Sequence, residues 1–172
     1  IDDCPVSCSR QVADSLPGES TVVCNGIALG QVPSPEVSPA GLRSRIGLSA
    51  GDTVYVCIAN LLKKKNHKLM LQAFSAAFGS GGDAHLVLIG QDGTERASLE
   101  QECSALGIGA NVHFHGPSPN ASRLLADADV FCLSSTFEGL PIALLESMAA
   151  GIPAIVTAVG GMPDAVVNQV TG

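Results

Sequence analysis

Two glutamates with seven residues between them have the types and spacing best suited to chemistry. Glu138 precedes a mostly apolar run, Leu140–Ala150, which is uncharged except for Glu146. A helix that is apolar on all faces is a buried helix, so the run predicts burial. An ionised carboxylate there must meet a partner or a ligand, because an unpaired buried charge is costly.

The start of this helix is expected to bind an anion. Pro141 suits the first helical turn and Gly151 suits the end, so the helix should begin near Pro141. Its free N–H groups would then lie close to Glu138, and such groups attract phosphate. Phosphate flanked by two acceptors of hydroxyl hydrogen bonds is the combination that a sugar nucleotide requires.

The basic residues are unevenly spread. All four lysines of the chain, Lys63, Lys64, Lys65 and Lys68, fall within six residues. The net charge of −7 argues against sequence-independent binding of nucleic acid. In an acidic protein one local cationic cluster suits a small anionic ligand, although a solvated helix start gives the same cluster.

Composition indicates a globular protein with an aliphatic core. The chain has 172 residues, 46% hydrophobic and 15% charged, enough for one domain and part of another. No apolar run reaches the roughly 20 residues that span a bilayer, and the first residues are acidic where a signal peptide is basic. The six cysteines show no CxxC spacing, so we expect reduced thiols and a cytoplasmic location.

Aliphatic runs alternate with helix-length segments from residue 51 onward. The expected strands are Thr53–Ala59, Ala84–Ile89, Asn111–Phe114, Val130–Leu133 and Pro153–Thr157. The expected helices are His67–Phe78, Thr94–Leu106, Pro119–Asp127, Pro141–Ala150 and Met162–Val167. This pattern predicts an α/β fold with a Rossmann-like, doubly wound parallel sheet covered on both faces. Ligands on such sheets bind outside the carboxyl ends of the strands.

The first 50 residues differ from the rest. Ile1–Leu16 predicts a strand and a helix with no sheet of their own, and Thr21–Cys24 a short strand. Gln31–Pro39 is proline-rich and typical of an extended linker. We interpret residues 1–24 as a remnant of an N-terminal acceptor domain and 25–50 as hinge and linker. Residues 51–172 would form a nucleotide-sugar-binding domain that is truncated at its C-terminal end.

Four segments resemble, in order, the retaining glycosyltransferases of family 4 (glycosyl transferases group 1), which have two Rossmann-like domains, the GT-B fold. Val22–Ile27 resembles the hinge V-I-P-N-G-I, and Ala59–His67 resembles G-R-L-x-x-x-K-G-H. Ala128–Pro141 resembles A-D-V-F-V-L-P-S-x-x-E-G-L-P, and Leu145–Gly161 resembles L-E-A-M-A-x-G-x-P-V-V-A-T-x-x-G-G. The resemblance covers nearly all of the chain and implies the C-terminal, donor-binding half.

The resemblance also implies roles for individual side chains. Glu146 takes the place of the residue that binds the ribose hydroxyls. Glu138 takes the place of the residue near the transferred sugar, which bonds a sugar hydroxyl or stabilises positive charge at the anomeric carbon. Lys65 matches the lysine that contacts the donor diphosphate. Asn60 stands where the family more often has arginine, which removes one charge from the expected clamp.

Backbone groups complete the expected site. The N–H groups of Gly139, Leu140 and Ile142 are candidates for binding phosphate or sugar, and Gly139 would let the backbone approach the donor closely. By resemblance, the turn at Gly116 and Pro117 lies near the nucleobase. No metal site is expected, because no Asp-x-Asp occurs and the histidines of the His-Phe-His stretch at 113–115 lack a third ligand.

Taken together, the resemblance implies the donor domain of a retaining, hexosyltransferase-type enzyme that transfers a sugar from a nucleotide diphosphate to an acceptor hydroxyl. A UDP-sugar is favoured as donor, without any cofactor. The acceptor, a glycan or glycolipid of polysaccharide biosynthesis, and any peripheral membrane contact would belong to the missing N-terminal domain. The fragment alone is therefore expected to be inactive.

Two other interpretations remain open. The domain could bind a nucleotide sugar without catalysis, and the departure at Asn60 favours that alternative. A nicotinamide-dependent Rossmann domain is disfavoured, because Ala59-Asn60-Leu61 stands where Gly-x-Gly-x-x-Gly would begin. The sequence does not identify the sugar, the base or the acceptor.

Overall fold

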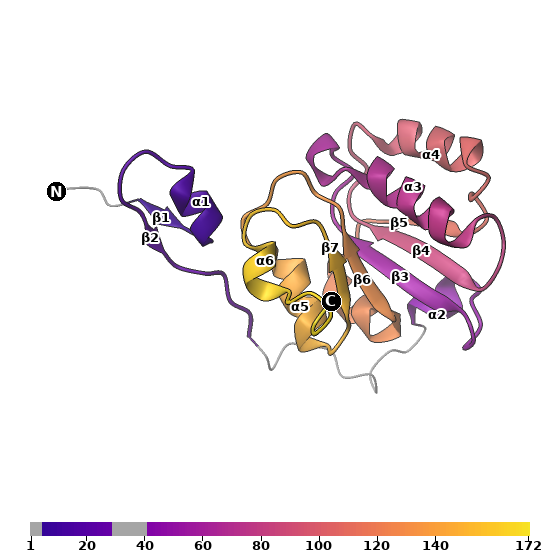
Figure 1. Ribbon diagram of the computed structural model, residues 1–172. Coiled ribbons are helices and arrows are strands. Elements are labelled where there is room, and N and C mark those ends of the chain that lie inside the picture. Colours follow the sequence, from indigo (N-terminus) through magenta and orange to yellow (C-terminus); the bar gives the residue numbers. More distant parts are fainter. Residues whose placement is uncertain (1–4, 29–40) are drawn as a thin grey trace.

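A computed structural model describes residues 5–28 and 41–172, and the predicted linker over 31–39 lies outside them (Figure 1). Five parallel strands form one sheet in the order β5-β4-β3-β6-β7. They are β3 (Thr53–Ile58), β4 (Ala84–Ile89), β5 (Val112–Gly116), β6 (Val130–Leu133) and β7 (Ala154–Val156). All five predicted strands are confirmed, and the chain winds outward in both directions from β3, which confirms the doubly wound arrangement.

The helices connect the strands as the periodicity predicts. They are α3 (His67–Phe78), α4 (Arg96–Ala105), α5 (Ile142–Ala149) and α6 (Met162–Ala165), with the 3₁₀ turn η3 (Ala121–Asp127). Two short elements, α2 (Leu42–Arg45) and the 3₁₀ turn η2 (Lys63–Lys65), were not predicted. On one side of the sheet α3 packs against α4, while η3 packs against α2 and α5 (Figure 1). No helix among residues 5–28 and 41–172 is long and apolar enough to cross a membrane.

The central strands are buried on both faces. Val54 and Val56 on β3 are fully buried, and the last four residues of β4 are buried as well. Cys57 and Cys132 lie inside this core, as expected for small apolar side chains. Burial raises the pKa of the Cys132 thiol to about 12, so both cysteines are structural.

The outer part of the sheet is less covered than the sequence predicts. A hollow of about 350 Å³ extends along α3 and over β6 and β7. Its lining is mainly apolar and includes Ile155, which is 62% exposed. Over this part of β6 and β7 the prediction of a sheet covered on both faces is therefore wrong, because no described element covers Ile155.

The N-terminal segment forms a small sheet of its own. Strand β1 (Val6–Ser7) pairs in parallel with β2 (Thr21–Val22), and α1 (Arg10–Asp14) connects them. The prediction that this segment has no sheet is therefore wrong. The pairing depends on main-chain bonds between residues about fifteen apart, which hydrophobic periodicity does not reveal. The segment reaches the large domain, because the side-chain amide of Asn25 donates to the carbonyl of Leu140 at 2.6 Å.

Candidate nucleotide-sugar site

Three strand tips are tied together on one side of the expected site. The backbone N–H of Gln91, after β4, donates to Asn60 Oδ1, after β3, at 3.0 Å. The N–H of Gly90 donates to the carbonyl of Gly116 at 3.0 Å, which joins the tips of β4 and β5. Gly116 has φ +78°, a conformation that suits glycine, and leads into exposed Pro117. The side-chain oxygen of Asn60 is thus already engaged by the protein.

An ion pair lies where the loop after β6 meets the segment after β3. The ammonium of Lys65 contacts Glu138 Oε1, and the hydroxyl of Ser135 donates to the same oxygen at 2.6 Å. Both charged side chains are largely buried, at 17% and 11% exposed. Among the described residues Oε2 of Glu138 accepts no hydrogen bond, so one carboxylate oxygen remains for a ligand. The structure brings these two predicted site residues into direct contact.

Helix α5 starts directly behind this pair. It begins at Ile142, with Pro141 as the residue before the first turn, and no side chain caps it. This start agrees with the prediction. Within the described residues no main-chain hydrogen bond uses the N–H groups of Gly139, Leu140 or Ile142. These N–H groups thus lack a main-chain acceptor, and the helix dipole favours an anion at this end.

The prediction that this helix is buried on all faces is wrong. In α5 only Leu144 and Ser147 are buried, and Ile142 is 44% exposed. The helix covers the sheet with one face, and its apolar outer face stays accessible. Glu146 is half-buried, and burial raises the pKa of its carboxyl group. In the described part of the chain it forms no ion pair, which is the arrangement expected of a carboxylate that binds a ligand.

The loop between Glu138 and α5 is closely packed. A Cβ at Gly139 would lie 2.3 Å from Cys8 Sγ, and a Cβ at Gly160 would lie 1.8 Å from the carbonyl oxygen of Glu138. The N–H of Gly161 also donates to the carbonyl of Gly139 at 2.5 Å. Gly139 is thus required for packing against the N-terminal segment, a reason independent of its predicted role in close approach to the donor.

A buried histidine lies beneath the site. His67 is the first residue of α3, as predicted, and is 2% exposed. Its Nε2 lies 3.7 Å from Cys57 Sγ, and its Nδ1 has no hydrogen-bond partner among the described residues. Burial, followed by the nearby charge of Lys65, lowers the pKa of His67 to about 4. The imidazole is therefore neutral at physiological pH.

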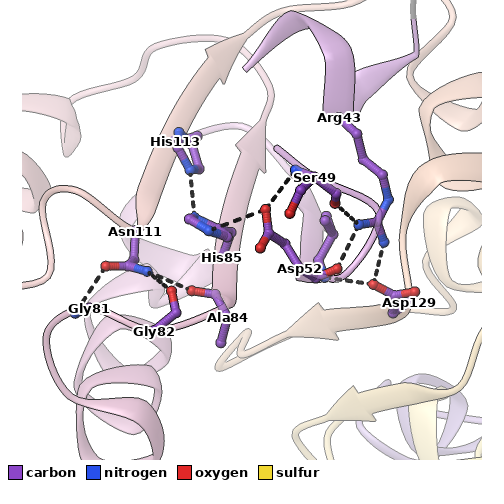
Figure 2. Close-up of polar contacts among 11 residues, drawn as sticks. Arg43, Ser49, Asp52, Gly81, Gly82, Ala84, His85, Asn111, His113 and Asp129 are labelled. Carbon is purple, nitrogen blue, oxygen red and sulfur yellow. Dashed lines mark hydrogen bonds and ion pairs between the residues drawn. The ribbon is translucent and has the colours of Figure 1, made fainter. Parts of the chain in front are cut away.

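A second polar cluster, which sequence reasoning missed, lies at the amino ends of the strands (Figure 2). Arg43 Nη2 lies 2.6 Å from Asp129 Oδ2, and the guanidinium also donates to the carbonyls of Ser49, Asp52 and Asp127. The position of Asp129 directly before a strand was the available signal, because a carboxylate there can accept a free strand N–H.

Two histidines meet beside this cluster. His85 Nδ1 lies 3.1 Å from His113 Nε2, and His85 Nε2 lies 4.0 Å from Asp52 Oδ2 (Figure 2). Burial and the neighbouring His85 lower the pKa of His113. In the part of the chain that the structure describes, no three His, Cys, Asp or Glu side chains are placed to hold a metal ion.

Comparison with known proteins identifies the family. The family described as "Glycosyl transferases group 1" matches residues 42–172. The chain belongs to this family. It is 37% identical over 131 residues to N-acetyl-alpha-D-glucosaminyl L-malate synthase of Bacillus anthracis, covering 76% of this chain and 34% of that protein. It is 32% identical over 143 residues to alpha-monoglucosyldiacylglycerol synthase of Streptococcus pneumoniae, covering 80% and 32%. This group 1 chain thus spans about a third of the length of these relatives.

Solved structures show the same fold as this group 1 chain. HepE from Anabaena, solved in complex with UDP and glucose, superposes with a TM-score of 0.80 at 22% identity, covering 95% of this chain and 46% of that one. The five-stranded parallel sheet with flanking helices is therefore a GT-B glycosyltransferase fold, as predicted.

Proposed function

We propose that this chain is the donor domain of a retaining glycosyltransferase and binds a nucleotide-diphosphate sugar at the carboxyl edge of its sheet. One observation carries the proposal. The Lys65–Glu138 pair lies beside the uncapped start of α5, and that helix contains the half-buried Glu146, which forms no ion pair with any described residue. A cation, free N–H groups and two carboxylates then lie on connected elements.

In this proposal the diphosphate lies between Lys65 and the first N–H groups of α5. Both stabilise the negative charge that develops on the leaving nucleotide diphosphate as the glycosidic bond breaks. Glu138 keeps one oxygen engaged with Lys65 and Ser135 and turns the other toward the sugar. There it accepts a sugar hydroxyl or stabilises positive charge at the anomeric carbon. Glu146 accepts the ribose hydroxyls, which satisfy its carboxylate only when the donor is bound.

The identity of the donor and acceptor is a further part of the proposal. The complex of HepE with UDP and glucose supports a UDP-sugar as donor. We place the nucleobase near Gly116 and Pro117, which end the neighbouring strand β5. The sugar is transferred to a hydroxyl of a glycan or glycolipid with retention of configuration and without a cofactor. Since the relatives are about three times as long, we propose that this chain binds the donor but does not transfer it.

A non-catalytic nucleotide-sugar-binding module is the second candidate. It is favoured by Asn60, which carries no charge and whose oxygen already accepts from Gln91. Only its amide N–H₂ can donate to a phosphate. Assaying transfer by the longer protein that contains this chain distinguishes enzyme from module.

Calorimetric titration with UDP-, GDP- and ADP-sugars tests the donor site. We expect one UDP-sugar to bind the wild-type chain, and Glu146→Ala to weaken it about tenfold or more through lost ribose contacts. Glu100→Ala, which removes an exposed glutamate on α4, is the matched control and should leave affinity unchanged. If none of the three donors binds, or if Glu146→Ala has no effect, the proposed site is wrong.

A further inference from the structure

One buried hydroxyl group connects the loop after β6 with the turn that precedes α3. Ser134 follows β6 directly and is 7% exposed. Its Oγ lies 3.0 Å from the carbonyl oxygen of Lys65 and 2.9 Å from that of Asn66. The Asn66 carbonyl also accepts from the N–H of Leu69 at 3.0 Å, whereas the described residues offer the Lys65 carbonyl no other donor. This hydroxyl therefore satisfies the Lys65 carbonyl and stabilises the turn at the lysine of the ion pair.

The turn needs such support. Asn66 has φ +50°, in the left-handed region, which asparagine adopts more readily than most residues but less readily than glycine. It is also the residue before the first turn of α3, and its side chain does not cap the helix. The neighbouring Lys64 carbonyl accepts from the N–H of Thr136 at 2.9 Å. Three consecutive carbonyls, at residues 64–66, are therefore bound by the loop that follows β6.

The same loop also holds the end of the lysine side chain. Glu138 contacts the ammonium of Lys65, and the hydroxyl of Ser135 donates to Oε1 of this carboxylate at 2.6 Å. The hydroxyl of Thr157, after β7, in turn donates to the carbonyl of Ser135 at 2.6 Å. Ser134 thus holds the backbone of Lys65, and Glu138 holds its side-chain ammonium.

Two departures from the family motif meet at this contact. Where the motifs quoted above have K-G and L-P, this chain has Lys65-Asn66 and Leu133-Ser134. Glycine adopts a left-handed conformation without cost, and proline has no hydroxyl to donate. The chain therefore has a less favourable residue in the turn together with a hydrogen bond that holds the turn in place.

We propose that Ser134 is a positioning residue that sets the placement of Lys65 for a diphosphate. This inference rests on the proposed function, since it assumes that Lys65 binds the donor phosphates. Ser134 touches the backbone of the lysine and not the ligand. Loss of the Ser134 hydroxyl should therefore weaken binding of the β-phosphate. Binding of the nucleoside by Glu146 should not change.

Titration with UDP and with UMP tests the role of this hydroxyl. We expect Ser134→Ala to weaken UDP binding about tenfold, the effect of one lost hydrogen bond, and UMP binding less than twofold. Ser134→Thr, which keeps the hydroxyl, should retain UDP affinity. Ser147→Ala is the matched control, because it removes a buried hydroxyl whose bond, to the carbonyl of Leu144, stays within α5. It should change neither affinity.

Amide hydrogen exchange without ligand gives a second readout. Exchange at Asn66 and His67 should be faster in Ser134→Ala than in the wild type or Ser147→Ala. Unchanged exchange, or equal weakening of UDP and UMP, overturns the positioning role while wild-type binding still supports the donor site. Failure of the wild-type chain to bind UDP overturns the donor site and the positioning role together. If the alanine variant does not fold, Ser134→Cys serves, with its weaker thiol donor.

Discussion

The two edges of the central sheet both carry charged clusters, but the clusters differ in how far they are satisfied. At the amino edge the Arg43 guanidinium contacts one carboxylate and three carbonyls, and Asp129 also accepts the N–H of Val54 at 2.7 Å (Figure 2). At the carboxyl edge Glu146 has no ion-pair partner in the described chain and Glu138 keeps one oxygen free.

This difference separates a structural cluster from a binding site. Groups that satisfy one another gain little from a ligand, and the amino edge therefore holds α2, β3 and the start of β6 together. Groups that stay unsatisfied reduce the stability of the free protein and regain that free energy when a ligand arrives. Charge alone does not distinguish the two edges, whereas the count of free donors and acceptors does.

The largest expected effect is on the amino edge. Arg43→Ala should lower the free energy of unfolding by about 3 kcal/mol, because it leaves a carboxylate and several carbonyls without their donor. Denaturant unfolding measures this change, with Arg123→Ala, at an exposed position, as control. UDP affinity of the folded variant should stay within twofold. A large loss of affinity would show that the amino edge takes part in binding.

A loss of affinity as well as stability is expected for Lys65 at the carboxyl edge. Lys65→Met should weaken UDP binding about thirtyfold, the effect of losing a charge-assisted contact to phosphate. The free energy of unfolding should also fall, by about 2 kcal/mol, because the substitution leaves the largely buried Glu138 carboxylate without its cation. Lys68→Met is the control, since Lys68 is exposed and pairs with Glu102 on α4. Equal affinities for the two variants would remove Lys65 from the site.

His67 predicts a pH dependence of stability. Its pKa is about 4 in the folded chain and about 6.5 when unfolded, so the unfolded chain alone takes up the proton between these values. Stability is thus lost as pH falls from 6.5 toward 4, by about 2 kcal/mol by pH 5. His67→Gln should remove this part of the loss in thermal unfolding at several pH values. His113→Gln, at the amino edge, is the comparison variant: the pKa of His113 is also lowered, so this variant should remove a smaller part of the loss. An identical profile for wild type and His67→Gln would contradict the assignment.

Much of the fold could be predicted from hydrophobic periodicity. The bounds of α3, β4 and β6 agree with the predicted bounds, because apolar spacing and turn residues there point to the same structure. The predicted burial of α5 failed since periodicity does not show whether another element covers an apolar face. The short helix α2 was not predicted, because four residues are too few to show a hydrophobic period.

The site was less accessible to sequence reasoning. The elements that carry Lys65 and Glu138 could be placed at the same sheet edge, but their contact spans 73 residues and depends on side-chain geometry. Ser134 gave no signal at all, since its hydroxyl acts on a turn 68 residues away. The contact between Arg43 and Asp129 spans 86 residues and depends in the same way on the packing of α2.

The most direct test measures affinity and stability together in Glu146→Gln. Burial raises the pKa of this carboxyl in the folded chain, so its ionised form costs stability at neutral pH, and that cost disappears as pH falls toward the unfolded value. We expect the variant to bind the UDP-sugar more weakly than the wild type. Its melting temperature at pH 7 should equal or exceed that of the wild type. At pH 5 the melting temperature of the wild type should rise relative to that of the variant. Unchanged binding, or a fall in stability at pH 7 alongside the fall in affinity, would show that Glu146 is a structural residue and would contradict the account.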